Sequence, residues 1–292
     1  MTRLLICFVL IVLGTDSFAQ NAYFATKGTI HFEKVVYTKA RMRELMAKHN
    51  GNRGMMYMGN IDEMPESSTS NFVLKFDQNQ TLMQPEAEDT PSKSGAAKVV
   101  TTNGRSSGGM RGNMASAQRN RGNNANSRFM RGNGKMGDKT YFQNIKSKTS
   151  EIQLQIDEKI IIKDSLQDVT WRFTDEFRTI AGYECRRVNG ATKDSLYLIA
   201  FYTEEIPVSG GPVLTGGLPG MILGLVIPEM HINYWATEVE FTNDALSNSW
   251  KDKKAKEMTA NDFFKLLSNT MFRGRGNNES LQRRQILEQV IY

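Results

Sequence analysis

Hydrophobic and polar residues alternate along most of this chain of 292 residues, a pattern typical of half-buried β-strands. The runs are rich in β-branched and aromatic residues, and short polar turns separate them, as in an antiparallel meander. The predicted strands are 28–37, 71–77, 141–145, 151–157, 159–164, 169–173, 182–188, 195–202, 221–227 and 232–241. We expect a mainly β fold with a few helices at its edges. The strand pattern is compatible with a large antiparallel meander sheet, either open or curled into a half-open barrel.

One predicted strand shows how the sheet meets solvent. In residues 151–157, Ile152 and Leu154 share one face, while Gln153 and Gln155 share the other. Successive side chains of a strand point to opposite faces. One side of the sheet is therefore expected to face water.

Helices are predicted at only a few places. Residues 39–51 place three apolar side chains at helical spacing and end in Asn-Gly, which suits a C-cap. Thr259 and Asp262 have the spacing of a capping box before an apolar run. Residues 246–292 are therefore expected to form a C-terminal helical segment.

Residues 84–139 interrupt the strand pattern. They are dominated by Gly, Asn, Ser, Arg and Met, and MRGN occurs at 110–113 and again at 130–133. Such a composition buries too little apolar surface to offset chain entropy, which costs about 1–2 kcal/mol per residue. We predict a disordered insertion between two strands of one β domain, which would comprise residues 20–83 and 140–245.

The net charge of +6 is concentrated in this insertion. Residues 90–137 contain nine Lys and Arg and no Asp or Glu, so the rest of the chain carries 6 − 9 = −3. The insertion has few aromatic residues for stacking on bases, and the chain is expected to be exported, so nucleic acid is disfavoured as a partner. An anionic glycan, lipid headgroups or an acidic protein patch would suit the charge; a solvated spacer is the plainer interpretation.

Residues 1–19 have the organisation of a secretory signal peptide. Arg3 precedes an apolar run at 4–13, and small residues precede a cleavage point near Ala19. The run is about half the roughly 20 residues that span a bilayer. Cys7 lies inside the run and not after the cut, which disfavours a lipoprotein. We predict an exported protein of the periplasm or cell surface, not an integral membrane protein, whose mature chain keeps one cysteine, Cys185.

The segment 216–225, GGLPGMILGL, suggests a glycine loop for phosphate at first sight. However, Pro212 and Pro219 lack the N–H groups that such loops direct at an anion, and the apolar run is too short for a membrane helix. Pro219-Gly220 suits a type II turn, with positive φ at Gly220. Residues 221–227 then predict a buried strand in which Gly224 leaves room for a close neighbour or a bulge.

This segment resembles the motif of the GLPGLI family, with Met221 in place of the usual Leu. IAGYECRRV at 180–188 and AFYTEEIPVSGGP at 200–212 also resemble family segments in order and spacing. The resemblance covers roughly 28–241, apart from the insertion. It implies an exported protein of Bacteroidota cell envelopes with no assigned enzymatic activity. The residues that carry the motif, expected to be structural, are Gly182, Tyr183, Cys185, Tyr202, Thr203, Ile206, Pro207, Gly211, Pro212, Gly217, Leu218, Pro219, Gly220, Met221 and Ile222.

Candidate chemistry elsewhere is sparse. Cys185 with His31, His49 or His231 could form a nucleophile pair, but alternation places Cys185 beside Tyr183 on one face, and a core position is favoured over a redox or catalytic thiol. The acidic pairs at 175–176 and 204–205 are adjacent in sequence, so within a strand their side chains diverge and form no acid/base dyad.

Methionine-rich runs raise the question of copper. MMYM at 55–58 lies near His49, and further methionines lie in the insertion. Thioethers suit Cu(I), although Met also serves as a filler of core gaps. We assign no residue as a catalytic, cofactor-binding or metal-binding group, and expect no cofactor.

Taken together, these patterns favour a non-enzymatic envelope binding or accessory module with a protein, lipid or glycan partner. An unrecognised thiol enzyme or hydrolase and a Met-rich copper-binding periplasmic protein are the alternatives. An apolar cavity inside the sheet would indicate lipid carriage, whereas a filled core would indicate contact with another protein.

Overall fold

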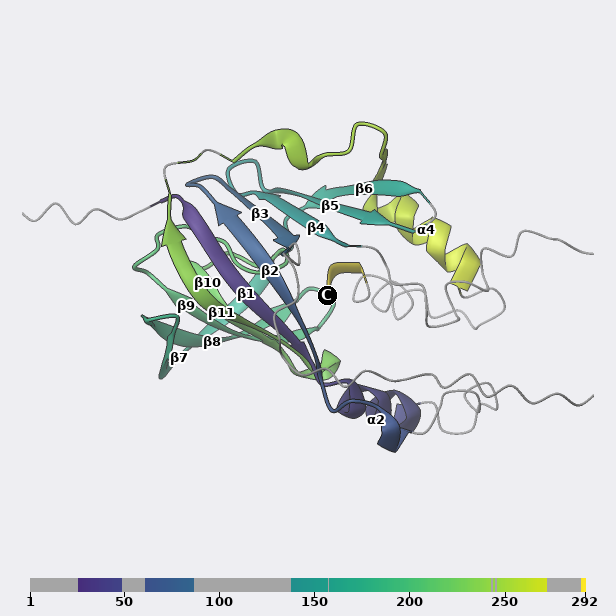
Figure 1. Ribbon diagram of the computed structural model, residues 1–292, viewed down its shortest axis with the longest axis horizontal. Coiled ribbons are helices and arrows are strands. Elements are labelled where there is room, and N and C mark those ends of the chain that lie inside the picture. The colour runs from purple at the N-terminus through teal and green to yellow at the C-terminus, as the bar shows by residue number, and fades with distance from the viewer. Residues whose placement is uncertain are drawn as a thin grey trace, which may run out of the picture.

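The computed structural model describes residues 26–48, 61–86, 138–156, 158–242, 244, 246–271 and 290–292. Within these residues, twelve strands form one sheet and two α-helices lie beside it (Figure 1). The strands are β1 Gly28–Val36, β2 Ser68–Phe76, β3 Gln80–Pro85, β4 Thr140–Asn144, β5 Thr149–Gln155, β6 Lys159–Ser165, β7 Val169–Ile180, β8 Tyr183–Thr192, β9 Tyr197–Thr203, β10 Met221–Ile227, β11 Ile232–Phe241 and β12 Lys256–Thr259. The helices are α2 Thr38–Lys48 and α4 Ala260–Met271, with 3₁₀ turns η2 Ile61–Glu63, η3 Pro228–Met230 and η4 Asn248–Trp250.

Two meanders make up the sheet. Strands β1 to β6 pair in sequence order, as do β7 to β11, and β1 joins the two sets by pairing antiparallel with β11. The predicted antiparallel meander is thereby confirmed. The exception is β12, which pairs parallel with β6 and makes the sheet mixed.

Strand β3 was not among the predicted strands. It pairs with β2 and β4 and runs to Pro85, so residues 84 and 85, placed at the start of the insertion from the sequence, belong to the sheet. The greater part of the predicted insertion, the predicted signal peptide and the methionine run at 55–58 lie outside the described residues.

The sheet is strongly curled but not closed. Strands β6 and β7 lie near opposite ends of the strand order, yet only residues 166–168 connect them. Four residue steps span at most about 14 Å, so the two sides of the sheet must approach each other at this end. The ends of the hydrogen-bonded order remain β12 and β7.

The concave inner face holds the main hydrophobic core, to which nearly every strand contributes. Ile30 and Phe32 of β1, for example, are 0% and 1% exposed. A small second cluster of Leu82, Phe142 and Trp250 lies apart from this core. Alternation holds in β5 as predicted, because Ile152 and Leu154 are buried while Gln155 is exposed.

The helix predicted at 39–51 and the helix predicted after the capping box at Thr259 are both present in the structure. α2 occupies 38–48, and its predicted C-cap lies outside the described residues. At α4, the Asp262 N–H donates to Thr259 Oγ1 (3.2 Å), and this hydroxyl donates to the Asp262 carboxylate (2.8 Å). No helix in the described part of the chain is both long and apolar enough to cross a membrane.

Candidate functional site

Residues 204–220 connect β9 to β10 and contain most of the family-like motif. The segment has little regular structure, yet many of its side chains are buried, among them Ile206, Val208 and Leu218 at 0%, 1% and 3% exposed. These side chains join the main core cluster. The inner face is therefore filled here by the motif segment.

Buried polar side chains from the first meander hold this segment. Gln143 of β4 donates from Nε2 to the main-chain oxygens of Val213 (3.4 Å) and Thr215 (3.2 Å). Its own Oε1 accepts from the Thr81 hydroxyl of β3 (3.2 Å). A buried loop must satisfy its backbone groups, and the sheet supplies these partners through Gln143.

The second meander contributes from the other side. Trp171 of β7 donates from Nε1 to the oxygen of Gly216 (3.0 Å), and the N–H of Gly217 donates to Ser209 Oγ (3.0 Å). The motif segment thus bridges β3 and β4 of one meander to β7 of the other. These hydrogen bonds connect the two meanders of the curled sheet through the motif segment.

The predicted type II turn at Pro219-Gly220 is wrong. The described glycines with positive φ are Gly182 (88°) and Gly217 (83°), and Gly220 is not one of them. Gly220 is required for space, because a Cβ there would collide with the carbonyl of Thr203. The glycine that uses its conformational freedom lies three residues earlier.

Both alternatives predicted for Gly224, a close neighbour and a bulge, are present in the structure. The ring of Trp235 would lie 2.6 Å from a Cβ at this position, and the register between β9 and β10 shifts between Ile222 and Gly224. Strand β10 is buried throughout except at Val226, and Pro228 follows it as the first residue of η3.

The motif residues divide by exposure, and they bring no catalytic constellation together. Pro207, Gly217 and Pro219 are exposed, and Tyr183 is half-buried. Gly182 forms the β7–β8 turn with Ala181. The buried members are Cys185, Tyr202, Thr203, Ile206, Gly211, Pro212, Leu218, Gly220, Met221 and Ile222.

Cys185 is a core residue. It is 0% exposed, its Sγ donates to the oxygen of Tyr183 (3.6 Å), and burial raises the pKa of the thiol to about 12. His31 and His231 instead contact Glu86 (3.0 Å) and Glu44 (2.6 Å). The structure does not pair Cys185 with either histidine, and His49 lies outside the described residues.

The acidic pairs lie at the surface, as expected. Asp175 and Glu176 are exposed at a bulge within β7, where they pair with Arg186 (3.1 Å) and Arg187. Among the described residues, no three His, Cys, Asp or Glu side chains are grouped to hold a metal ion.

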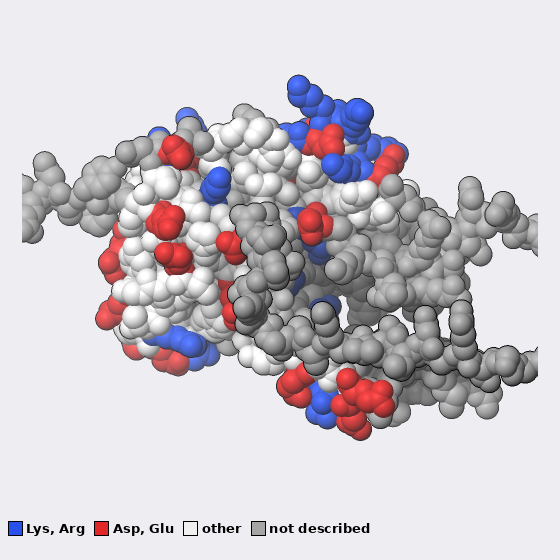
Figure 2. Space-filling model, in the orientation of Figure 1, with Lys and Arg blue, Asp and Glu red and all other residues white. Residues whose placement is uncertain are grey.

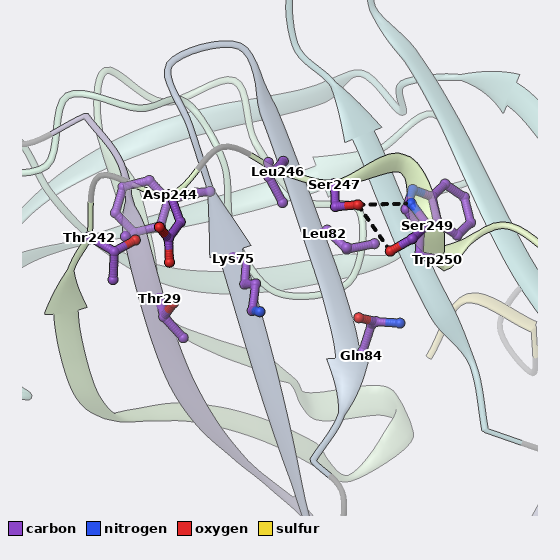
Figure 3. A pocket seen from close by; sticks show the side chains of 12 residues that line it. Thr29, Lys75, Leu82, Gln84, Thr242, Asp244, Leu246, Ser247, Ser249 and Trp250 are labelled. Carbon is purple, nitrogen blue, oxygen red and sulfur yellow. Dashed lines mark hydrogen bonds between the residues drawn. The ribbon is translucent and has the colours of Figure 1, made fainter.

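A pocket of about 580 Å³ lies between the sheet and the 242–250 segment (Figure 3). Its floor comes from neighbouring strands, since Thr29 of β1 is in register with Lys75 of β2, which is in register with Leu82 of β3. The lining residues are Gly28, Thr29, Lys75, Phe76, Leu82, Gln84, Thr242, Asp244, Leu246, Ser247, Ser249 and Trp250.

One wall of the pocket is fixed by aromatic stacking. The rings of Trp250 and Phe142 lie 5.3 Å apart in a stacked arrangement, and Lys251 Nζ lies 5.2 Å from the centre of the Trp250 ring. Trp250 is 8% exposed, and its Nε1 has no hydrogen-bond partner among the described residues. A buried N–H without a partner is costly, so the stacking on Phe142 fixes the ring in spite of this cost.

The polar groups of the pocket are of mixed kind. Lys75 and Asp244 are both exposed, and neither has an ion-pair partner in the described part of the chain. Hydroxyl groups come from the sheet and from the covering segment, where Ser247 Oγ accepts from the N–H of Ser249 (3.2 Å). No motif in the sequence pointed to this pocket, because its two sides are far apart in the chain.

Charge on the described surface is mixed. Figure 2 shows basic side chains beside acidic ones at the top of the molecule. Ion pairs among the described residues include Lys159–Asp252 (2.7 Å) and Lys251–Glu151 (2.7 Å). The positive charge predicted for the insertion lies outside the described residues.

Comparisons with known proteins add little about function. Residues 188–224, from the middle of β8 to the middle of β10, match the model of a family described as a protein of unknown function (Porph_ging). No curated protein matches the chain. Two solved structures of PNGF-II, in space groups C2 and P21, are similar at 13% and 14% identity with TM-scores of 0.47 and 0.46. They cover 84% and 86% of this chain, which spans about a third (33% and 34%) of theirs.

Proposed function

We propose that this protein is an exported member of the GLPGLI family that acts as a non-enzymatic binding module of the cell envelope, with the pocket over β1–β3 as its ligand site. The partial match over residues 188–224 is consistent with that family. The observation that carries the binding role is the pocket itself. Its volume of about 580 Å³ lies in the usual range for small-molecule sites, roughly 300–1,000 Å³.

The lining favours a neutral ligand rich in hydroxyl groups. Ser and Thr hydroxyls and the Gln84 amide each donate and accept hydrogen bonds. Lys75 adds a donor and Asp244 an acceptor, and their opposite charges cancel. Such alternation of donors and acceptors matches a sugar better than a lipid tail or a phosphate. We therefore favour a short neutral glycan among the envelope partners expected from the sequence.

Trp250 gives the site a rigid apolar wall with one polar group. Its ring stacks on Phe142, while its Nε1–H group donates to no acceptor among the described residues. Leu82 and Leu246 extend the apolar wall.

Calorimetric titration of the purified protein with short soluble oligosaccharides tests this role. The panel contains neutral chains and uronic-acid chains of equal length. Lys75→Met and Trp250→Phe are each expected to weaken binding of a neutral chain about tenfold, the effect of about 1.4 kcal/mol. Phe can still stack on Phe142 but offers the ligand a smaller apolar wall. Lys146→Met, at an exposed lysine in the β4–β5 turn, is the matched control.

Three outcomes bear on the proposal separately. Absence of binding to every oligosaccharide would remove the glycan assignment. Binding that persists unchanged in both pocket variants would place the site elsewhere. Fractionation of cells and mass measurement of the tagged protein test export, since recovery from the cytoplasm with residues 1–19 intact would contradict it.

A further inference from the structure

Polar side chains follow the pocket along the outer face of β1. Ile30 and Phe32 are core residues, and successive side chains of a strand point to opposite faces. Thr29, His31 and Glu33 therefore share the outer face. Thr29 lines the pocket, and His31 and Glu33 follow it at steps of about 7 Å.

The row of side chains at His31 adjoins the pocket directly. His31 is in register with Val73 of β2, which is in register with Gln84 of β3. Residues in register on neighbouring strands share one face, and Gln84 is itself a lining residue of the pocket. Figure 3 shows Gln84 farther along β3 than Leu82, and farther from the covering segment 242–250. A ligand that extends from the pocket along the sheet meets this row first.

The row at Glu33 is connected to the row at His31. Glu33 is in register with Asn71, and the N–H of Glu86, just after β3, donates to the main-chain oxygen of Asn71 (3.0 Å). The Glu86 carboxylate contacts His31 Nδ1 (3.0 Å). Since His31 belongs to β1 and Glu86 follows β3, this contact crosses β2 and holds both side chains on the outer face.

We call His31, Asn71, Gln84 and Glu86 the polar strip. Asn71 and Glu86 are exposed, and His31 and Gln84 are half-buried. The two amides each donate and accept hydrogen bonds, the imidazole donates, and the carboxylate accepts. Sugar hydroxyls also both donate and accept, so a sugar chain finds partners along the whole strip.

Carboxylates border the strip on the side of β11. Glu240 is in register with Thr29, and Glu238 is in register with His31. In the part of the chain that the structure describes, Glu33, Glu238 and Glu240 form no ion pair. Like charges brought together in a complex are unfavourable. The border therefore disfavours a chain of uronic acids and accepts a neutral chain.

We infer that the polar strip extends the pocket, and that the ligand is a neutral oligosaccharide and not a single sugar. This inference rests on the glycan role proposed for the pocket. One end of the chain occupies the pocket. The next units lie over Gln84 and Val73, and the units after these meet His31, Asn71 and Glu86.

Calorimetric titration with neutral oligosaccharides, from disaccharide to hexasaccharide, tests the strip. Wild-type affinity is expected to rise with chain length. Asn71→Ala and His31→Ala are each expected to weaken hexasaccharide binding about fivefold, the effect of one lost hydrogen bond, and to leave disaccharide binding unchanged. Lys75→Met weakens the binding of both, since Lys75 lines the pocket, and the control Lys146→Met weakens neither.

The bordering carboxylates have a test of their own. The double variant Glu33→Gln/Glu238→Gln is expected to raise the affinity for a hexameric uronic-acid chain at least about threefold, because two like charges leave the border. A purely structural role of these side chains would produce no such gain. Stronger binding of the acidic than of the neutral hexamer by wild type contradicts the inference.

The chain-length series separates the strip from the pocket. Equal wild-type affinity for all lengths overturns the strip, and so does equal weakening of disaccharide and hexasaccharide binding in Asn71→Ala and His31→Ala. In either case, disaccharide binding that depends on Lys75 leaves the pocket in place. Failure of every chain to bind removes both the strip and the pocket.

Discussion

Gln143 of β4 donates a hydrogen bond to the main-chain oxygen of Thr215, which lies 72 residues later in the chain, at 3.2 Å. Both residues are 2% exposed. The same amide serves Val213 and Thr81. One side chain therefore satisfies the backbone of a buried loop and fixes that loop to the first meander.

Replacement of Gln143 by leucine tests this role. Leucine has a similar size but leaves the oxygens of Val213 and Thr215 without this donor, and a buried unsatisfied group costs about 1–3 kcal/mol. We expect Gln143→Leu to lower the free energy of unfolding by about 2–3 kcal/mol in urea titrations. Gln155→Leu, at an exposed position of β5, should change it by less than about 0.5 kcal/mol. Equal effects of the two changes would refute the role of Gln143.

The two motif glycines should respond differently to alanine. Gly220→Ala forces a Cβ into the carbonyl of Thr203, and overpacking of this kind costs about 1–3 kcal/mol. Gly217→Ala meets no atom closer than 3.6 Å and suffers only from its φ of 83°, a cost of about 1–2 kcal/mol. Thermal or urea unfolding of both variants gives the order. If Gly217→Ala loses more free energy of unfolding than Gly220→Ala, positive φ and not space is the main requirement at the motif glycines.

Local pattern predicted most strands of the sheet but not how the sheet curls. Ten predicted strands correspond to strands of the structure because alternation is a property of neighbouring residues. Strand β3 was missed because QTLMQP is short, ends in proline and adjoins a polar segment. The parallel pairing of β12 with β6 joins residues about a hundred positions apart, and no local pattern records such a contact.

The sites were harder to predict than the strands. The pocket depends on the 242–250 segment crossing Thr29 and Lys75, whose register is set by strand pairing. Lys34 did leave a signal, since it occupies an inward position after Ile30 and Phe32. A lysine in an apolar alternation is the local indication of a partly buried ammonium group.

Cys185 should behave as a core residue toward thiol reagents. A thiol with a pKa raised to about 12 carries almost no thiolate at pH 8, and its side chain is fully buried. We expect the native protein to react with Ellman's reagent only at the rate at which it opens, and to react at once in denaturant. Rapid stoichiometric reaction of the folded protein would revive the thiol-enzyme alternative.

The buried lysines predict how stability depends on pH. The pKa of Lys139 falls from 10.5 to about 7 on folding, and that of Lys34 from 10.5 to about 8. Below pH 10.5 the unfolded chain therefore binds more protons than the folded chain, so the free energy of unfolding rises with pH across this window. Burial raises the pKa values of Tyr141 and Tyr234, so these two tyrosines stay neutral throughout this window.

Lys139→Met isolates this contribution. In phosphate-free buffer, urea titrations from about pH 6 to about pH 9 should show wild-type stability rising with pH. Lys139→Met should be more stable than wild type at the acid end and should flatten the rise, because methionine removes the buried cation without leaving a cavity. Lys146→Met provides the comparison at an exposed lysine and should keep the wild-type slope. If Lys139→Met retains the full slope, or loses stability at about pH 6, the ammonium group at this position is not held in a water-poor site.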